Sequence, residues 1–175
     1  MAPPPRITPA TRRVIVASTA LVVILAAWTA IDQLFLSPRT VNSCRIEPES
    51  VCVYADLIDQ DLTAVEMSDS EFYRSRMMGV ILVDADLSDS RLYQVRLDGA
   101  NLTRVDLSGT QMYGANLSGA TAIDADFTGA NMRYVNFTGA DLTGADLTGA
   151  DDEGMILDGA VLDGTTMPDG TVVGS

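Results

Sequence analysis

Several residue types that build common active sites are missing or scarce in this chain. The 175 residues contain no His and no Lys, two Cys and one Trp. Without His, and with only two Cys, the usual zinc cages and the Ser-His-Asp type of triad are excluded. The basic residues are all Arg and are outnumbered by 24 acids, which gives a net charge of −13. This balance argues against nucleic acid as a partner.

A five-residue repeat occupies most of the chain. From 55 to 169, a large apolar residue stands at nearly every fifth position, with Ala122 and Asp152 as the exceptions. A small residue precedes it by two positions, Asp or Asn often comes directly before it, and Ser or Thr often follows. A period of five fits neither a helix nor a strand, so each unit must bury its apolar pair against the next layer of an array.

The repeats Ala100-Asn101-Leu102-Thr103, Ala125-Asp126-Phe127-Thr128-Gly129 and Ala140-Asp141-Leu142-Thr143-Gly144 resemble the pentapeptide repeat family. The resemblance covers 55–169. It implies an all-β domain, a right-handed quadrilateral β-helix with four pentapeptides per turn. Residues four repeats apart would then lie one above the other.

The N-terminal region predicts a single membrane-spanning α-helix. Val14 to Ile31 carries no charge, and the apolar stretch extends to Leu36. We expect a retained transmembrane helix over 14–36, with a cleaved signal peptide as the alternative. Arg6, Arg12 and Arg13 favour a cytoplasmic segment over 1–13 and a repeat domain outside the cytoplasmic membrane.

Residues 37–54 are expected to form a linker and an N-terminal cap for the β-helix, because its end layer would otherwise be exposed. Cys44 and Cys52 are predicted to form a disulfide in an oxidising compartment. Alternatively, Cys52 simply fills the first core layer. At the other end, Asp152 predicts an imperfect last coil, followed by a frayed tail over 170–175 in which valines partly cover the final layer.

An acidic column follows from the four-repeat stacking. Its carboxylates repel one another, and they could mimic a phosphate backbone or bind cations. The structural alternative is that they accept hydrogen bonds from turn backbone. Beside them, a column of hydroxyls is expected to hydrogen-bond from coil to coil. The acidic column comprises Glu66, Asp86, Asp106, Asp126 and Asp146, and the hydroxyl column comprises Ser68, Ser88, Ser108, Thr128 and Thr148.

A second column carries aromatic residues that the repeat does not require. Tyr and Arg are enriched in protein interfaces, so this edge is a candidate partner-binding surface. The alternative is a self-contained stack in which Arg side chains neutralise nearby acids. The candidates are Tyr73, Tyr93, Tyr113 and Arg133 in the column, with Arg74, Arg91, Arg76 and Arg96 around it. A third column of alternating charge, Asp84, Arg104 and Asp124, predicts a stabilising ladder.

The sequence offers no nucleophile-base pair, no phosphate-binding loop and no metal-ligand spacing, so we expect no enzyme activity, cofactor, metal or small-molecule substrate. The favoured function is a membrane-anchored interaction or scaffold module, such as an accessory subunit of a membrane complex. Its partner would be another membrane or extracytoplasmic protein. The family resemblance suggests an alternative, mimicry of duplex DNA and binding to DNA gyrase. A purely structural spacer is the third possibility.

Overall fold

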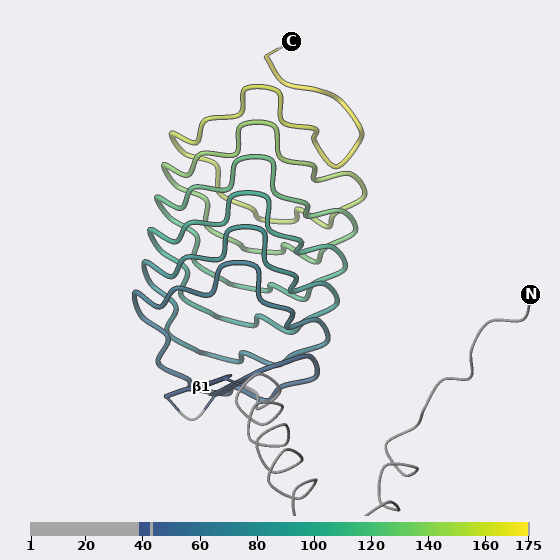
Figure 1. Cartoon of the computed structure of the whole chain (residues 1–175). Helices are drawn as coiled ribbons and strands as arrows, with labels where there is room; N and C mark the ends of the chain where they lie inside the picture. Colours follow the sequence, from purple (N-terminus) through teal and green to yellow (C-terminus); the bar gives the residue numbers. More distant parts are fainter. Residues whose placement is uncertain (1–38, 43, 175) are drawn as a thin grey trace, which may run out of the picture. The chain divides into compact units, whose positions relative to one another are not determined.

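A computed structural model describes residues 39–42 and 44–174 of the chain. After a short hairpin of β1 (Arg39–Val41) and β2 (Cys44–Ile46), the backbone winds into a stack of similar coils (Figure 1). Parallel β-bridges join residues twenty apart, from Val51↔Glu71 up to Asp146↔Thr166. Each lap therefore takes four pentapeptides, and the prediction of an all-β, four-sided β-helix is confirmed.

The predicted cytoplasmic segment 1–13 and transmembrane helix 14–36 lie outside the described residues. Within the part that is described, there is no helix long and apolar enough to cross a membrane.

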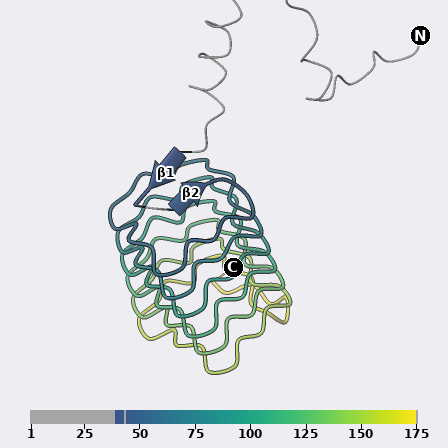
Figure 2. The ribbon, with the colours of Figure 1, turned by 90° about the horizontal axis from the view of Figure 1, so that it is seen from below.

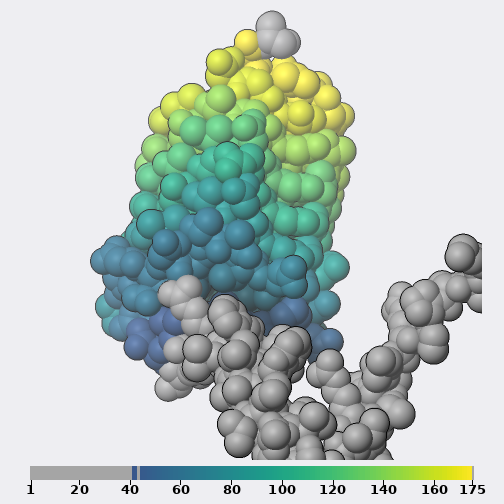
Figure 3. Space-filling model, viewed as in Figure 1, coloured from purple at the N-terminus to yellow at the C-terminus, as the bar shows by residue number. Residues whose placement is uncertain are grey.

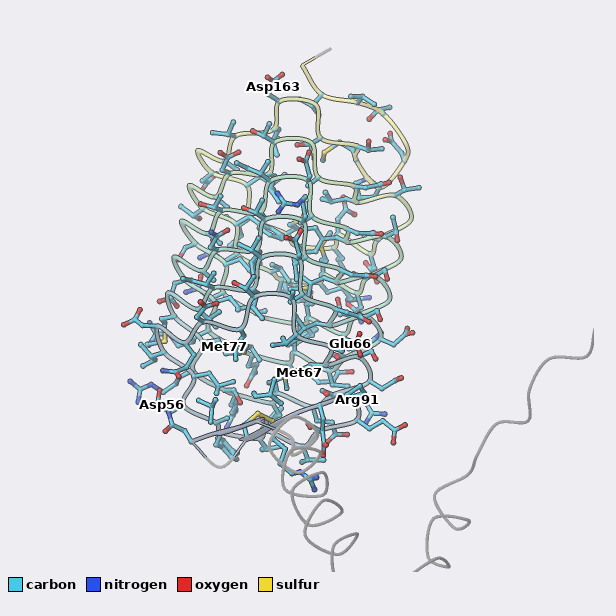
Figure 4. All side chains as sticks on the ribbon, in the orientation of Figure 1. Asp56, Glu66, Met67, Met77, Arg91 and Asp163 are labelled. Carbon is cyan, nitrogen blue, oxygen red and sulfur yellow. A yellow bond between two sulfur atoms is a disulfide. The ribbon has the colours of Figure 1, made fainter. Side chains whose placement is uncertain are left out.

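Two side chains of every repeat point into the solenoid. Central residues such as Leu57, Met67 and Phe72 are fully buried, and the small residues two positions earlier are almost as inaccessible. Figure 4 shows Met67 and Met77 directed inward, whereas Glu66 and Arg91 point outward. A quarter-turn every five residues brings both inward positions back to the same axis, which explains why the period is five.

Several buried hydroxyls at the small inward position bond to the neighbouring lap, whereas Thr110 bonds to Leu107 within its own lap and Ser50 Oγ has no partner among the described residues. Ser70 Oγ accepts the backbone N–H of Ser50 at 3.0 Å, and Ser75 Oγ donates to the carbonyl of Cys52 at 2.5 Å. Ser can replace Ala at these two positions because each buried hydroxyl has a hydrogen-bond partner.

Ala122 is the smallest central residue, yet it is completely buried. In the same stretch, Phe127 and Phe137 meet edge to face, with ring centroids 5.7 Å apart. Since protein interiors are close-packed, we infer that the two rings occupy the volume that a Leu would otherwise fill at Ala122.

The hairpin closes the N-terminal end of the solenoid. Strands β1 and β2 lie across the first coils (Figure 2), and Val41 and Ile46 pack against the core. A disulfide joins Cys44 to Cys52, which is itself 3% exposed in the first core layer. The predicted disulfide is thus present, and Cys52 also fills the core. The bridge ladder starts at Val51, so 51–54 already belong to the first coil.

The C-terminal end differs from the expectation of a frayed tail. Val172 forms an antiparallel bridge with Thr166, and the N–H of Gly164 donates to the carbonyl of Val173 at 2.8 Å. The tail therefore folds back over one side of the last coil. As expected, that coil is imperfect: Asp152, at a core position, is exposed.

Candidate protein-interaction surface

The predicted acidic column is present in the structure, and its carboxylates accept hydrogen bonds from the turns. Parallel bridges stack Glu66, Asp86, Asp106, Asp126 and Asp146 in order. In each Asp repeat, one carboxylate oxygen accepts the N–H two residues later, as between Ser88 N and Asp86 Oδ1 at 2.9 Å. The structural interpretation of these side chains is confirmed.

The hydroxyl column does not bond from coil to coil, so that expectation is wrong. Ser88 Oγ donates to Asp86 Oδ1 at 2.7 Å, and Ser108 and Thr148 repeat this contact within their own pentapeptides. The reason is proximity: the carboxylate that accepts the backbone N–H is already within reach of the hydroxyl on the same residue.

The tyrosines share one face of the solenoid, which we call the tyrosine face: Tyr54, Tyr73, Tyr93, Tyr113 and Tyr134. The stacking of this column is set by backbone bonds, from Arg74 N to the Tyr93 carbonyl at 2.9 Å and from Gln94 N to the Tyr113 carbonyl at 3.0 Å.

The rings pair differently from a simple column. Tyr73 packs edge to face against Tyr54, with centroids 5.8 Å apart, and Tyr113 packs against Tyr134 at 5.4 Å. Among the described residues, no ring contact joins Tyr73 to Tyr93 or Tyr93 to Tyr113. The two pairs leave much aromatic surface in contact with solvent: Tyr54 is 65%, Tyr134 48% and Tyr113 42% exposed.

Most arginines around the tyrosine face are engaged in ion pairs. Arg91 pairs with Glu71, Arg76 with Asp56 at 3.2 Å, and Arg96 with Asp98 at 3.1 Å; Arg133 pairs with Glu153 and lies 3.6 Å from Asp151. Exposed pairs of this kind contribute little to stability, because solvent screens them. These four predicted partner-binding arginines therefore form local pairs, as the self-contained alternative anticipated.

Arg74 is the exception. Its Nε donates to Gln94 Oε1 at 2.7 Å, and its guanidinium carbon lies 5.2 Å from the centroid of the Tyr73 ring. Within residues 44–174, it has no carboxylate partner. The tyrosine face thus keeps one cation that acids do not neutralise.

The backbone of the tyrosine face holds several non-glycine residues in the left-handed conformation. The second residue after each central one has a positive φ, which Gly adopts freely and other residues adopt at a cost. Tyr54, Arg74, Gln94 and Tyr134 have φ between 53° and 57°. On the next face the same position is Gly from Gly79 to Gly159, whereas the opposite face carries Ala64, Asp84, Arg104 and Asp124 there, also at positive φ. Sequence reasoning missed Tyr54, although the spacing of Tyr54, Arg74 and Tyr134 was the signal that could have found it.

In the alternating-charge column, the predicted contact between Asp84 and Arg104 is confirmed. Arg104 pairs with Asp84, and the charge of Asp124 also favours the protonated guanidinium. Hydrogen bonding from Arg104 holds the pKa of Asp84 below its usual 3.8. This contact lies away from the tyrosine face and acts as a link between laps.

Other kinds of site are sparse in the described part of the chain. Residues 39–42 and 44–174 contain no cluster of three or more His, Cys, Asp or Glu side chains that could hold a metal. A pocket of about 340 Å³ lies at the C-terminal end and is lined by Asp152, Met167, Pro168, Asp169 and Thr171.

Laps of four pentapeptides and two inward side chains per repeat define a β-helical repeat protein. The family model for pentapeptide repeats matches in eight copies over residues 81–119 and 110–149. Residues 81–149 therefore match the pentapeptide repeat family, whose members form right-handed quadrilateral β-helices.

Solved structures of the same family are similar to this chain. The pentapeptide repeat protein Rfr23 from the cyanobacterium Cyanothece 51142 is 25% identical over 67% of this chain and 88% of its own, with a TM-score of 0.58. A protein of the Arabidopsis thaliana thylakoid lumen is 29% identical over 59% and 70%, with a TM-score of 0.48. The fluoroquinolone resistance protein QnrB1 is 12% identical over 67% and 73%, with a TM-score of 0.48. No curated protein matches significantly.

Proposed function

We propose that this protein is a membrane-anchored interaction module that binds another protein through its tyrosine face. The observation that carries the proposal is the set of long side chains on left-handed backbone at Tyr54, Arg74, Gln94 and Tyr134. Each such residue costs about 1 kcal/mol or more relative to Gly. The opposite face has the same backbone at Ala64, Asp84, Arg104 and Asp124, where Arg104 and Asp84 form an ion pair. On the tyrosine face two of the four are exposed Tyr, which favours a role for those side chains beyond folding.

The chemistry of the face suits protein recognition. Tyr offers a large apolar area with a polar tip and few rotatable bonds, so ordering it on binding costs little entropy. The Arg74 guanidinium lies over the Tyr73 ring and has no acid partner within residues 44–174, so it adds a directed cation. We therefore expect a partner surface with apolar grooves and an acidic side chain.

Anchoring is part of the proposal and rests on the apolar sequence over 14–36. The Cys44–Cys52 disulfide supports a solenoid outside the cytoplasm, because such bonds persist in oxidising compartments. We expect the partner to be a membrane or extracytoplasmic protein, such as another subunit of a membrane complex.

Copurification tests the tyrosine face. The full chain with a C-terminal tag is extracted in mild detergent, and its stable partners are compared with those of Tyr73→Ala/Tyr93→Ala/Tyr113→Ala. The matched control is Val83→Ala/Thr103→Ala/Ile123→Ala, which changes the same repeat positions on the opposite face. Loss of a partner in the first variant alone supports the proposal. Retention in both variants contradicts it, and a wild-type chain that captures nothing indicates a spacer.

A second candidate function is the DNA mimicry suggested by the family resemblance. The observation in its favour is the continuous acidic column from Glu66 to Asp146. A reporter fused after Ser175 separates the two functions. Activity of a reporter that works only outside the cytoplasm supports the anchored interaction module, whereas activity of a cytoplasm-only reporter supports gyrase binding and contradicts the proposed location.

A further inference from the structure

The last lap of the solenoid leaves a β-edge open. One lap earlier, Met132, Tyr134, Phe137, Gly139 and Leu142 each donate their backbone N–H to the coil above. In the last lap the equivalent groups have no acceptor within residues 44–174, and three carbonyls that should receive a bond have no donor there. These groups are the N–H of Asp152, Gly154, Leu157, Gly159 and Leu162, and the carbonyls of Ala150, Met155 and Ala160.

The tail shows what such an edge accepts. On the remaining side, the carbonyl of Val173 receives the N–H of Gly164, and Val173 N donates to the carbonyl of Thr165 at 2.9 Å. An extended segment thus already occupies the place of a further lap at 164–167. The tail forms no backbone hydrogen bond with residues 150–162, which we call the open edge. The last lap and the tail together form the yellow end of the solenoid in Figure 3.

Apolar side chains border the open edge. Ile156 and Val161 replace the usual Asp or Asn and are 43% and 50% exposed. Met155, Leu157 and Leu162 are only partly covered, although their counterparts in lower laps are buried. A bound chain would therefore remove apolar surface from water in addition to pairing backbone groups.

The charge around the open edge is predominantly negative, although Arg133 pairs with Glu153 and lies 3.6 Å from Asp151. Beyond Arg133 the chain has no basic residue. Asp152 and Asp169 line the pocket of about 340 Å³, and Asp169 accepts bonds from Thr171 that hold its pKa low. Figure 4 shows Asp163 at this end of the solenoid. The carboxylates at this end are Asp151, Asp152, Glu153, Asp158, Asp163 and Asp169.

A second copy of this chain does not fit the open edge. Stacking end on end would set these six carboxylates against their own copies, which is repulsive. Stacking the base of one solenoid on the tip of another is blocked, because β1, β2 and the disulfide already cover the base. The occupant must instead bring positive charge and free backbone groups.

We propose that the open edge over 150–162 binds an extended, basic segment of a partner protein by β-strand addition. Backbone pairing supplies the general affinity, Ile156 and Val161 contact its apolar side chains, and the surrounding carboxylates select Arg or Lys. This site adjoins the tyrosine face, because the Tyr134 hydroxyl donates to Glu153 Oε1 at 3.2 Å. The variants that test the two sites change different residues, so either proposal can fail without the other.

The test uses the full-length protein and a fluorescein-labelled peptide of alternating Arg and Val, with binding followed by fluorescence anisotropy. Two comparison peptides separate the contributions: alternating Glu and Val, and the Arg-Val peptide with alternate backbone nitrogens methylated. We expect the Arg-Val peptide alone to bind well. Amide exchange measured by NMR should slow at Gly154, Leu157 and Gly159 when it binds, because those N–H groups gain acceptors.

Two variants locate the site. Asp158→Arg should weaken binding roughly tenfold or more, since it inverts a charge at the edge, whereas Glu66→Arg, an equal change on a lower lap, should have little effect. Ile156→Thr should weaken binding while keeping a branched side chain. The proposal is overturned if the methylated peptide binds equally well, if no edge amide is protected, or if Glu66→Arg weakens binding as much as Asp158→Arg.

Discussion

Arg104 donates hydrogen bonds from Nε and Nη2 to the two carboxylate oxygens of Asp84, one lap earlier, at 2.6 and 2.8 Å. The bond lowers the pKa of Asp84 below 3.8. A lowered pKa in the folded protein means that the link stabilises the fold fully above pH 3.8 and stops doing so as the pH falls through the lowered value. Both residues are exposed, so the effect on stability is small.

The first prediction concerns this titration. In Arg104→Gln, the pKa of Asp84 should rise towards 3.8, as measured by NMR of the side-chain carboxyl carbon. Asp169, whose pKa is lowered by bonds from Thr171, is the internal control and should not change. An unchanged Asp84 titration in the variant would show that Arg104 is not the cause.

The second prediction separates the two effects of the acidic column. Asp106→Asn keeps the oxygen that accepts from Ser108 but removes a charge between two like charges. We expect it to be neutral or stabilising at low salt, with the benefit shrinking as salt is added. Asp106→Ala should lose about 1 kcal/mol because it removes the acceptor. Urea denaturation at two salt concentrations measures both, and equal loss in the two variants would contradict the interpretation.

The third prediction concerns the base of the solenoid. Reducing the Cys44–Cys52 disulfide should cost about 2 kcal/mol, mainly by freeing the hairpin that covers the first coil. Amide exchange should accelerate in β1 and β2 and leave the central laps unchanged. Cys44→Ser/Cys52→Ser should show the same exchange with or without reductant. Equal protection before and after reduction of the wild-type chain would mean that the cap does not depend on the bond.

The fourth prediction tests the packing around Ala122. Ala122→Leu should destabilise the protein by about 1–3 kcal/mol, because the Phe127 and Phe137 rings occupy the space that it needs. Adding Phe127→Leu should cost less in Ala122→Leu than in the wild-type background. A double-mutant cycle from denaturation curves gives the coupling. If the two losses of stability simply add, the Phe127 ring and the side chain at position 122 do not compete for the same space.

Much of the fold could be predicted because a single spacing sets it. The five-residue register fixes which side chains are buried, and the four-repeat lap fixes which residues stack, as for Glu66 and Asp86. The ends could not be predicted in the same way. The fold-back of Val172 onto Thr166 depends on which edge groups remain unpaired after the last lap, and no local pattern encodes this.

The sequence predicted which residues of the candidate surface stack above one another, but not which side chains touch. Stacking placed Tyr73, Tyr93 and Tyr113 correctly, but the Tyr73 ring packs against Tyr54 and the Tyr113 ring against Tyr134, both in the adjacent column. Rotamer choice decides this, and rotamers depend on neighbours in space. The ion pairs of Arg91 and Arg133 follow the same rule: column position brings the partners near, and side-chain length determines whether they meet.

The twenty-residue lap also restricts how this chain can change in length. Loss of one pentapeptide would carry every later residue a quarter-turn round the axis, so that Tyr134 would no longer share a face with Tyr113. Loss or gain of a whole lap preserves every face and alters only the distance between the capped base and the open end. The solenoid can therefore serve as an adjustable spacer whose reach varies in fixed steps while its binding surfaces keep their orientation.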